Sequence, residues 1–223
     1  MKKNLFIVPI LVVVFYLSGN IQAKGQEGLA ILGGVNFQNL NGKDFEGDKL
    51  ENDMIIGYHI GVNFAIPVAT EFYFQPGVML STKGAEDKSG DFSVKSNFSY
   101  IEVPLNLVYK PALGNGFLVL GFGPYIGYAV MGKVTSELGS ESEETDIEFQ
   151  NTVESTDSFA VPYARAIDAG ANILFGYEMQ NGIFLQLNSQ FGMLNVNPED
   201  KRITDDKTMV KHTGFGLSLG YRF

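Results

Sequence analysis

Large apolar residues alternate with small or polar residues in eight separate segments of this chain. Gly214–Phe223 shows the pattern most clearly, since every second residue is large and apolar while glycine, serine and arginine fill the positions between. Side chains of a β-strand point to opposite faces in turn, so this period of two predicts strands with one apolar face. Strands of about 10 residues or more cross a bilayer when they are tilted. The predicted strands lie around Leu29–Phe37, Ile56–Ile66, Phe72–Ser81, Ile101–Lys110, Leu118–Val130, Ile167–Glu178, Ile183–Met193 and Gly214–Phe223.

The connections between these strands fall into two classes that alternate along the chain. The short ones are Pro67–Thr70, Pro111–Gly116 and Gln180–Gly182, and the last contains Asn-Gly, a strong hairpin signal. The long, polar ones are Asn39–Asp53, Gly84–Asn97, Lys133–Val161 and Asn195–Thr208. Bacterial membrane barrels have short periplasmic turns and longer outer loops. The pattern therefore predicts an all-β fold, an eight-stranded antiparallel up-and-down transmembrane β-barrel with long outer loops and short periplasmic turns.

The residues on the second face of the strands indicate which face meets lipid. That face carries few lysines or glutamates along the strand middles and is rich in glycine, asparagine, glutamine and serine. A water-exposed surface normally carries charge, whereas side chains fill the narrow lumen of an eight-stranded barrel. The apolar face is therefore predicted to meet lipid, and a soluble lipocalin-like barrel with inverted faces is the alternative. Interfacial girdles are expected from Phe37, Tyr58, Phe72, Tyr109, Phe117, Tyr128, Tyr177 and Tyr221.

The N-terminal segment has the composition of a secretory signal peptide. Lys2 and Lys3 precede an apolar run, Leu5–Leu17, that is too short for a transmembrane helix. Small Ala23 marks the expected cleavage point, so residues 1–23 are predicted as the signal peptide and residues 24–223 as the outer-membrane barrel domain. The absence of cysteine excludes lipoprotein processing, disulfides and thiolate metal sites. A formal net charge of −9 argues against nucleic acid as a partner.

The C-terminal strand has a second predicted role. It must pair with the first strand, since a closed barrel leaves no free edge. A terminal aromatic residue preceded by alternating apolar residues resembles the signal by which the barrel-assembly machinery recognises outer-membrane barrels. In this chain the residues of that signal are Phe215, Leu217, Leu219, Tyr221 and Phe223.

Four stretches of the sequence resemble one known family. They are "SYIEVPLNLVYK" (Ser99–Lys110), "GFGPYIGY" (Gly121–Tyr128), "RAIDAGANILFGYEM" (Arg165–Met179) and "QFGMLNV" (Gln190–Val196). In order and spacing they are similar to the PorT-like outer-membrane β-barrel family, over essentially the whole chain after residue 23. The resemblance implies an eight-stranded outer-membrane barrel. It implies no single function, because members range from a component associated with secretion to proteins of unassigned role.

Five ionisable residues on the polar face are predicted to form a polar network in the lumen. They are His59, Glu102, Asp168, Glu178 and Arg222. Buried charges are costly unless they are paired. Glu178 and Arg222 are expected near the periplasmic rim, and Glu102 and Asp168 in the outer half with His59 as the nearest basic group. A network that plugs the lumen is the favoured interpretation, and a path for protons or small solutes is the alternative.

The sequence predicts no enzyme, and no catalytic residue, cofactor or metal site. Ester hydrolysis by a Ser/His/acid arrangement needs three side chains that converge at a place open to lipid. The chain has two histidines, His59 and His212, and no sequence pattern places a hydroxyl and an acid beside either. A lipid-modifying barrel enzyme and a small-solute channel remain as alternatives.

The longest predicted loop is strongly acidic. Residues 135–157 carry Glu137, Glu141, Glu143, Glu144, Asp146, Glu148, Glu154 and Asp157 and no basic residue. The spacing lacks the ordered D-x-D-x-D-G pattern of a calcium loop, so a solvated, mobile loop is predicted, and it is the expected place for a protein partner. The other long loops carry Lys43, Lys49, Lys83, Lys88, Lys95, Lys201, Arg202 and Lys207, which are candidates for contact with lipopolysaccharide phosphates.

Together these features predict an exported, monomeric, non-enzymatic barrel of the cell outer membrane. The expected role is that of a structural or surface-interaction protein, or of an accessory to a secretion or uptake system. Its expected partners are outer-membrane lipid, lipopolysaccharide and the barrel-assembly machinery.

Overall fold

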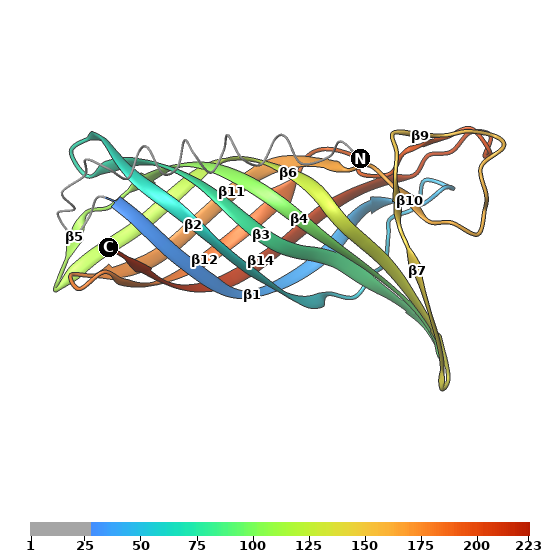
Figure 1. Ribbon diagram of the computed structural model, residues 1–223, viewed down its shortest axis with the longest axis horizontal. Coiled ribbons are helices and arrows are strands. Elements are labelled where there is room, and N and C mark those ends of the chain that lie inside the picture. Colours follow the sequence, from blue (N-terminus) through green and yellow to red (C-terminus); the bar gives the residue numbers. More distant parts are fainter. Residues whose placement is uncertain (1–27) are drawn as a thin grey trace, which may run out of the picture.

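Eight long strands form one closed antiparallel barrel (Figure 1). The computed structural model describes residues 28–223, so the predicted signal peptide, residues 1–23, lies outside the described residues. The barrel strands are β1 (Gly28–Lys43), β2 (Ile55–Ala69), β3 (Phe72–Ser89), β4 (Phe92–Tyr109), β6 (Gly116–Leu138), β11 (Ile167–Met179), β12 (Ile183–Gly192) and β14 (Met209–Arg222). The connections contain β5 (Ala112–Leu113), β7 (Glu141–Asp146), β8 (Glu148–Phe149), β9 (Thr152–Val153), β10 (Tyr163–Ala164) and β13 (Glu199–Asp200).

The barrel closes where the last strand pairs with the first. β14 lies antiparallel to β1, from the pair Ala30 and Arg222 at one end to the pair Lys43 and Met209 at the other. β11 pairs with both β6 and β12, so each barrel strand has two neighbours. Lipid offers no hydrogen bonds to backbone amides, and closure gives every barrel strand a partner on both sides. The predicted fold class is confirmed.

Short turns and long connections lie at opposite ends of the barrel. The links β2–β3, β4–β6 and β11–β12 are short, and the end that carries them is called the periplasmic end below. The links β1–β2, β3–β4, β6–β11 and β12–β14 lie at the other end, called the outer end, on the right of Figure 1. This arrangement agrees with the alternation of connection lengths in the sequence.

Two outer connections differ from the loops that the sequence predicted. β3 and β4 continue as a paired hairpin to Ser89 and Phe92, so most of residues 84–97 are strand. β6 continues to Leu138 and returns as β7, so residues 133–146 also form a hairpin. Each tip is a two-residue turn whose first residue is a glycine with positive φ, 62° at Gly90 and 61° at Gly139.

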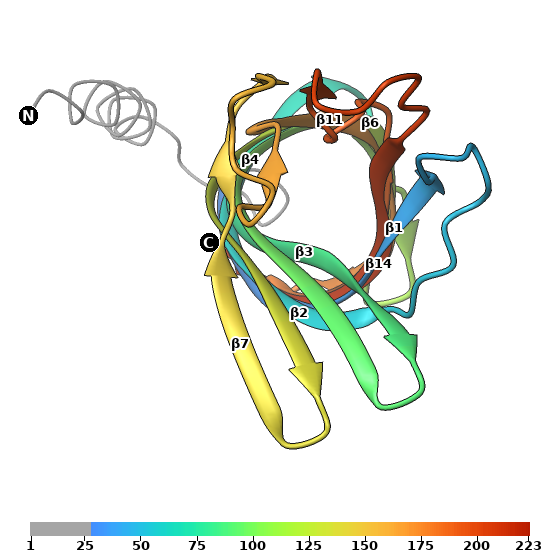
Figure 2. The same cartoon turned by 90° about the vertical axis from the view of Figure 1, so that its right-hand side faces the viewer.

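The two hairpins belong to one sheet. β4 pairs with β6 from the barrel wall out to the pair Phe92 and Leu138. The strand order β3–β4–β6–β7 therefore continues beyond the barrel as a four-stranded sheet, called the outer sheet below. Figure 2 looks into the outer end and shows this sheet leaning to one side of the opening.

The outward side chains of the barrel wall are apolar, and the inward ones are small or polar. Ile56, Phe122 and Leu219 on the outside are 71%, 63% and 62% exposed, which is the arrangement of a wall that meets lipid. The prediction that the apolar face lies outside is confirmed. One girdle residue was predicted wrongly, because Phe117 faces the lumen, where Lys110 Nζ lies 5.8 Å from its ring centre. No helix in residues 28–223 is long and apolar enough to cross a membrane.

Candidate functional site

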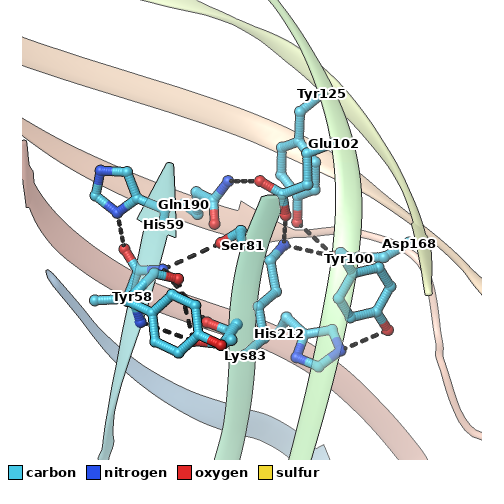
Figure 3. Close-up of polar contacts among 12 residues, drawn as sticks. Tyr58, His59, Ser81, Lys83, Tyr100, Glu102, Tyr125, Asp168, Gln190 and His212 are labelled. Atoms are coloured by element: carbon cyan, nitrogen blue, oxygen red, sulfur yellow. Dashed lines mark hydrogen bonds and ion pairs between the residues drawn. The ribbon is translucent and has the colours of Figure 1, made fainter. Parts of the chain in front are cut away.

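Three charged residues form a buried cluster in the outer half of the lumen. Lys83 Nζ lies 2.5 Å from Glu102 Oε1 and 2.9 Å from Asp168 Oδ2, and all three side chains are at most 1% exposed. The Tyr125 hydroxyl donates to Asp168 Oδ2 at 3.0 Å, and Gln190 Nε2 donates to Glu102 Oε2 at 3.0 Å. Figure 3 shows these contacts converging from several strands of the barrel. Lys83, Glu102 and Asp168 are called the outer charge cluster below.

Two predictions about the residues of the outer charge cluster were wrong. Lys83 was assigned to an outer loop as a candidate for lipopolysaccharide contact, but β3 runs on to Ser89 and carries this side chain into the lumen. His59 was expected as the nearest basic group to Glu102 and Asp168. Lys83 occupies that place, and two carboxylates share its ammonium group.

Aromatic side chains close the lumen on the outer side of this cluster. The Tyr100 hydroxyl is hydrogen-bonded to His212 Nε2 at 3.0 Å, and Phe98 packs edge-on against the His212 ring. Ile147 and Ala164, from the β6–β11 connection, complete the same buried apolar cluster. Tyr100 and His212 are at most 1% exposed, so both side chains are buried within this layer.

A second charged cluster closes the periplasmic end. Glu178 Oε1 accepts from Lys110 Nζ at 2.7 Å, and Glu178 Oε2 accepts from Arg222 Nε at 3.1 Å. Arg222 also donates to the Gly28 carbonyl at 3.0 Å and to Asn63 Oδ1 at 3.2 Å. The structure thus brings Glu178 and Arg222 together at this rim, and adds Lys110, which the sequence interpretation had left out of the network.

His59 lies between the two clusters, in a chain of polar contacts. Its Nδ1 is 2.7 Å from Asn36 Oδ1, and its Nε2 is 2.7 Å from Ser218 Oγ. The arrangement has the order hydroxyl, imidazole and amide, with an amide where a Ser/His/acid triad has a carboxylate. Asn188 Nδ2 donates to the same Ser218 oxygen at 2.8 Å. Both His59 and Ser218 are buried, at 4% and 0% exposure.

A small cavity of about 50 Å³ lies in the lumen between the clusters, and His59 and Glu102 line part of it. Four buried amide atoms in its lining lack a protein partner: Gln38 Oε1, Gln75 Nε2, Asn106 Oδ1 and Asn172 Oδ1. Buried polar atoms of this kind are normally satisfied by ordered water, and a cavity of this size has room for it. Buried charged clusters lie on both sides of this cavity, so the interior of the barrel is polar.

The acidic segment 135–157 is folded, in contrast to the mobile loop that the sequence predicted. Its first part is the β6–β7 hairpin, and β9 pairs with β13 of the β12–β14 connection. Arg202 binds Asp200 at 2.6 Å and lies over the ring of Phe159 at 4.3 Å. This hydrogen bond to Arg202 holds the pKa of Asp200 below its usual range. Lys201 pairs with Glu154 at 2.8 Å.

Two of the loop residues that were predicted as candidates for lipopolysaccharide contact therefore bind other residues of this protein. Lys201 and Arg202 join two outer connections to each other. The pair of Lys201 with Glu154 offsets part of the negative charge of the acidic segment. Among residues 28–223 no group of three or more histidine or acidic side chains is arranged to hold a metal ion.

The residues of the predicted assembly signal lie on the outward face of β14. Phe215, Leu217, Leu219, Tyr221 and Phe223 are between 39% and 62% exposed and would meet lipid. The Phe223 amide donates to the Leu29 carbonyl at 2.9 Å, so backbone pairing extends to this residue. Their role in assembly stays a prediction.

Several solved structures are similar to this chain at low sequence identity. Ail, the attachment invasion locus protein of Yersinia pestis, is 13% identical over 88% of this chain and 99% of its own, with a TM-score of 0.38. The structure of Ail in complex with the heparin analogue sucrose octasulfate is 15% identical with the same coverage and a TM-score of 0.37. The NanC porin is 9% identical over 87% of this chain and 100% of its own, with a TM-score of 0.27. No curated protein matches the chain.

A sequence family shows where this chain belongs. Residues 26–197, which include seven of the eight barrel strands, match the family described as "Outer membrane protein beta-barrel domain". The closed ring of strands, the apolar outer wall and the polar lumen are what a small barrel of this kind requires. This chain belongs to the outer membrane protein beta-barrel domain family.

Proposed function

We propose that this protein is a non-enzymatic surface-interaction protein that binds another protein through the free edge of its outer sheet. The barrel anchors the outer sheet in the outer membrane. The partner is an extended, basic protein segment. One observation carries the proposal: β7 continues the sheet beyond the barrel and pairs on one side only, with β6, among the described residues.

The unpaired side of β7 has the properties of a strand-addition site. Free amide and carbonyl groups on a sheet edge form hydrogen bonds with an added strand. β7 carries Glu141, Glu143 and Glu144, and only Glu144 has an ion pair, with Lys133 at 2.8 Å, among the residues described. Basic side chains on the added strand would complement this charge. A protein that served only to fill the membrane would not need a folded sheet that protrudes from it.

The proline variant Ser142→Pro tests the edge of β7. The two-residue turn makes Leu138 and Glu141 a hydrogen-bonded pair, so the amide of the next residue, Ser142, points away from β6. Proline there removes an edge donor and leaves the β6–β7 ladder intact. The probe is an immobilised peptide of alternating lysine and valine. We expect Ser142→Pro to bind it about tenfold more weakly than wild type, which corresponds to about 1.4 kcal/mol.

Two further variants separate the edge from its charge. Ser142→Thr keeps the backbone donor and should bind like wild type. Replacing Glu141 and Glu143 with glutamine should weaken binding and flatten its dependence on salt. Equal binding by Ser142→Pro and wild type would refute strand addition, even if the glutamine variant binds weakly.

A channel function has little support from the lumen. The outer charge cluster and the Glu178 cluster are buried at opposite ends, and the cavity between them measures about 50 Å³. Porins with many more strands are needed for an aqueous passage. The lumen therefore serves to hold the barrel together.

A lipid-modifying enzyme is the second candidate, because His59 lies between a serine and an amide. Ser218 is fully buried and faces the lumen, so neither a lipid nor a water-soluble ester reaches it. We expect no labelling of Ser218 by a fluorophosphonate probe in the folded protein, and equal phospholipid hydrolysis by wild type and Ser218→Ala. Labelling that disappears in both Ser218→Ala and His59→Gln would establish the enzyme instead.

The remaining parts of the proposal concern export and assembly. We propose that residues 1–23 direct export, that the barrel-assembly machinery recognises the outward residues of β14, and that the mature barrel is a monomer in contact with lipopolysaccharide. The four sequence stretches named above support placement among PorT-like barrels. A role as accessory to a secretion or uptake system fits the same outer sheet, since such systems need a docking surface.

A further inference from the structure

An apolar groove of about 470 Å³ runs along the outside of the barrel wall. It is lined by Phe72, Leu107, Tyr109, Leu120, Phe122 and Phe175, together with neighbouring apolar atoms. The groove is far larger than the lumenal cavity of about 50 Å³, and it has the volume of sites that hold small molecules. A binding space larger than the lumenal cavity therefore lies on the lipid side of the wall.

The groove exists because a short side chain is surrounded by large rings. Leu120 of β6 lies directly between Tyr109 of β4 and Phe175 of β11 in the strand register. One step toward the outer end, Phe122 lies between Leu107 and Ile173. Leu120 is shorter than the three rings around it, so it forms the floor and the rings form the walls.

The groove lies in the periplasmic half of the wall. Phe72 is the first residue of β3 after the short β2–β3 turn, and Tyr109 is the last residue of β4, with their ring centres 4.9 Å apart. The carboxylate of Glu71 in that turn lies beside the hydroxyl of Tyr109. The groove therefore opens into the inner leaflet of the membrane, and a negative charge lies at its periplasmic end.

We infer that this groove holds one acyl chain of an inner-leaflet phospholipid whose headgroup carries an ammonium group. The lining is almost wholly apolar, and the material that meets this surface in a membrane is acyl chain. A rigid groove orders one chain in a fixed position, unlike the smooth parts of the wall. The Glu71 carboxylate favours a cationic ammonium group at the headgroup level and disfavours a purely anionic headgroup.

Native mass spectrometry of the full barrel tests this site. The barrel is released from detergent after addition of phosphatidylethanolamine or phosphatidylglycerol, and the fraction that keeps one lipid is measured. Leu120→Phe fills the floor of the groove, and we expect it to keep phosphatidylethanolamine about tenfold less than wild type. Leu80→Phe is the matched control, because Leu80 is 38% exposed on the same kind of wall against 37% for Leu120, and it lies outside the groove.

A third variant tests the headgroup. Wild type should prefer phosphatidylethanolamine to phosphatidylglycerol, and Glu71→Gln should lose that preference while it still keeps a lipid. Equal lipid retention by Leu120→Phe and Leu80→Phe would overturn the inference, as would a dimer that Leu120→Phe converts to a monomer, since a second copy would then fill the groove. The outer sheet takes no part in this test, so its result is independent of the proposed surface interaction.

Discussion

Replacing Lys83 with methionine is expected to destabilise the folded barrel by about 3–5 kcal/mol, the usual cost of removing one partner from a buried ion pair. Lys83 is the shared partner of Glu102 and Asp168, and no part of its side chain is exposed. Without its ammonium group, two carboxylates face each other inside the lumen with no counter-charge. The remaining hydrogen bonds from Tyr125 and Gln190 cannot balance two negative charges.

The measurement uses the resistance of folded barrels to detergent at room temperature. Unboiled samples taken along a urea series show folded and unfolded protein as separate gel bands, which gives the unfolding midpoint. Lys133→Met is the control, since Lys133 and its partner Glu144 are both more than half exposed and such a pair contributes about 0–1 kcal/mol.

A rescue variant shows whether charge is the cause. Lys83→Met combined with Glu102→Gln and Asp168→Asn removes all three charges, and it should recover most of the lost stability. If Lys83→Met unfolds at the same urea concentration as wild type, the cluster does not stabilise the barrel. If the triple variant is no better than the single one, lost packing of the lysine stem is the cause.

The barrel wall could be predicted from the sequence because its signal is repeated eight times. Each strand obeys the same period of two, and a register error would move apolar residues such as Ile60 into the lumen. The alternation also placed His59, Glu102 and Asp168 on the inward face, where the structure has them. The sequence could not show which inward residues contact one another, because contacts across a lumen depend on strand tilt and side-chain length.

Lys83 was missed because the predicted third strand ended at Ser81. The inward positions of β3 continue at Lys83 and Ala85, and both are buried. A lysine in a polar stretch gives no sign that it faces inward. The alternation of apolar and polar residues alone therefore did not predict that the third strand continues past Ser81. The predicted fourth strand began too late, at Ile101, whereas β4 begins at Phe92, so it left out Tyr100, which contacts His212 inside the barrel.

The outer hairpins had a signal that the interpretation did not use. Gly90 is followed by Asp91, and Gly139 by Ser140, and glycine before aspartate or serine suits a two-residue hairpin turn. Valine and phenylalanine near these turns, such as Val94 and Phe92, support strands on either side. The many charged residues beside these turns hid the strand pattern, because a high density of charge usually indicates a solvated loop.

Replacing Gly34 with alanine is expected to destabilise the barrel strongly, because the backbones of β1 and β14 lie close together where the barrel closes. A Cβ atom at Gly34 would lie 1.8 Å from the Leu217 carbonyl oxygen of β14 and 2.9 Å from Cε1 of His59. β1 and β14 cannot keep their register around such a group, so the strands must separate where the barrel closes. We expect a loss of about 3 kcal/mol, at the upper end for an added methyl group, and a reduced yield of the heat-modifiable form.

The neighbouring glycine provides the control for this effect. A Cβ at Gly33 has the His59 carbonyl oxygen as its nearest atom, at 3.4 Å, and it points to the lipid side. Gly33→Ala should therefore change the free energy of unfolding, obtained from the urea series, by no more than about 0.5 kcal/mol. Equal behaviour of the two alanine variants would show that the seam has room for a methyl group, and that β14 holds β1 less closely than the structure indicates. A loss confined to Gly34→Ala would identify the β1–β14 seam as the place where added volume is least tolerated, since both variants add the same methyl group to the same strand.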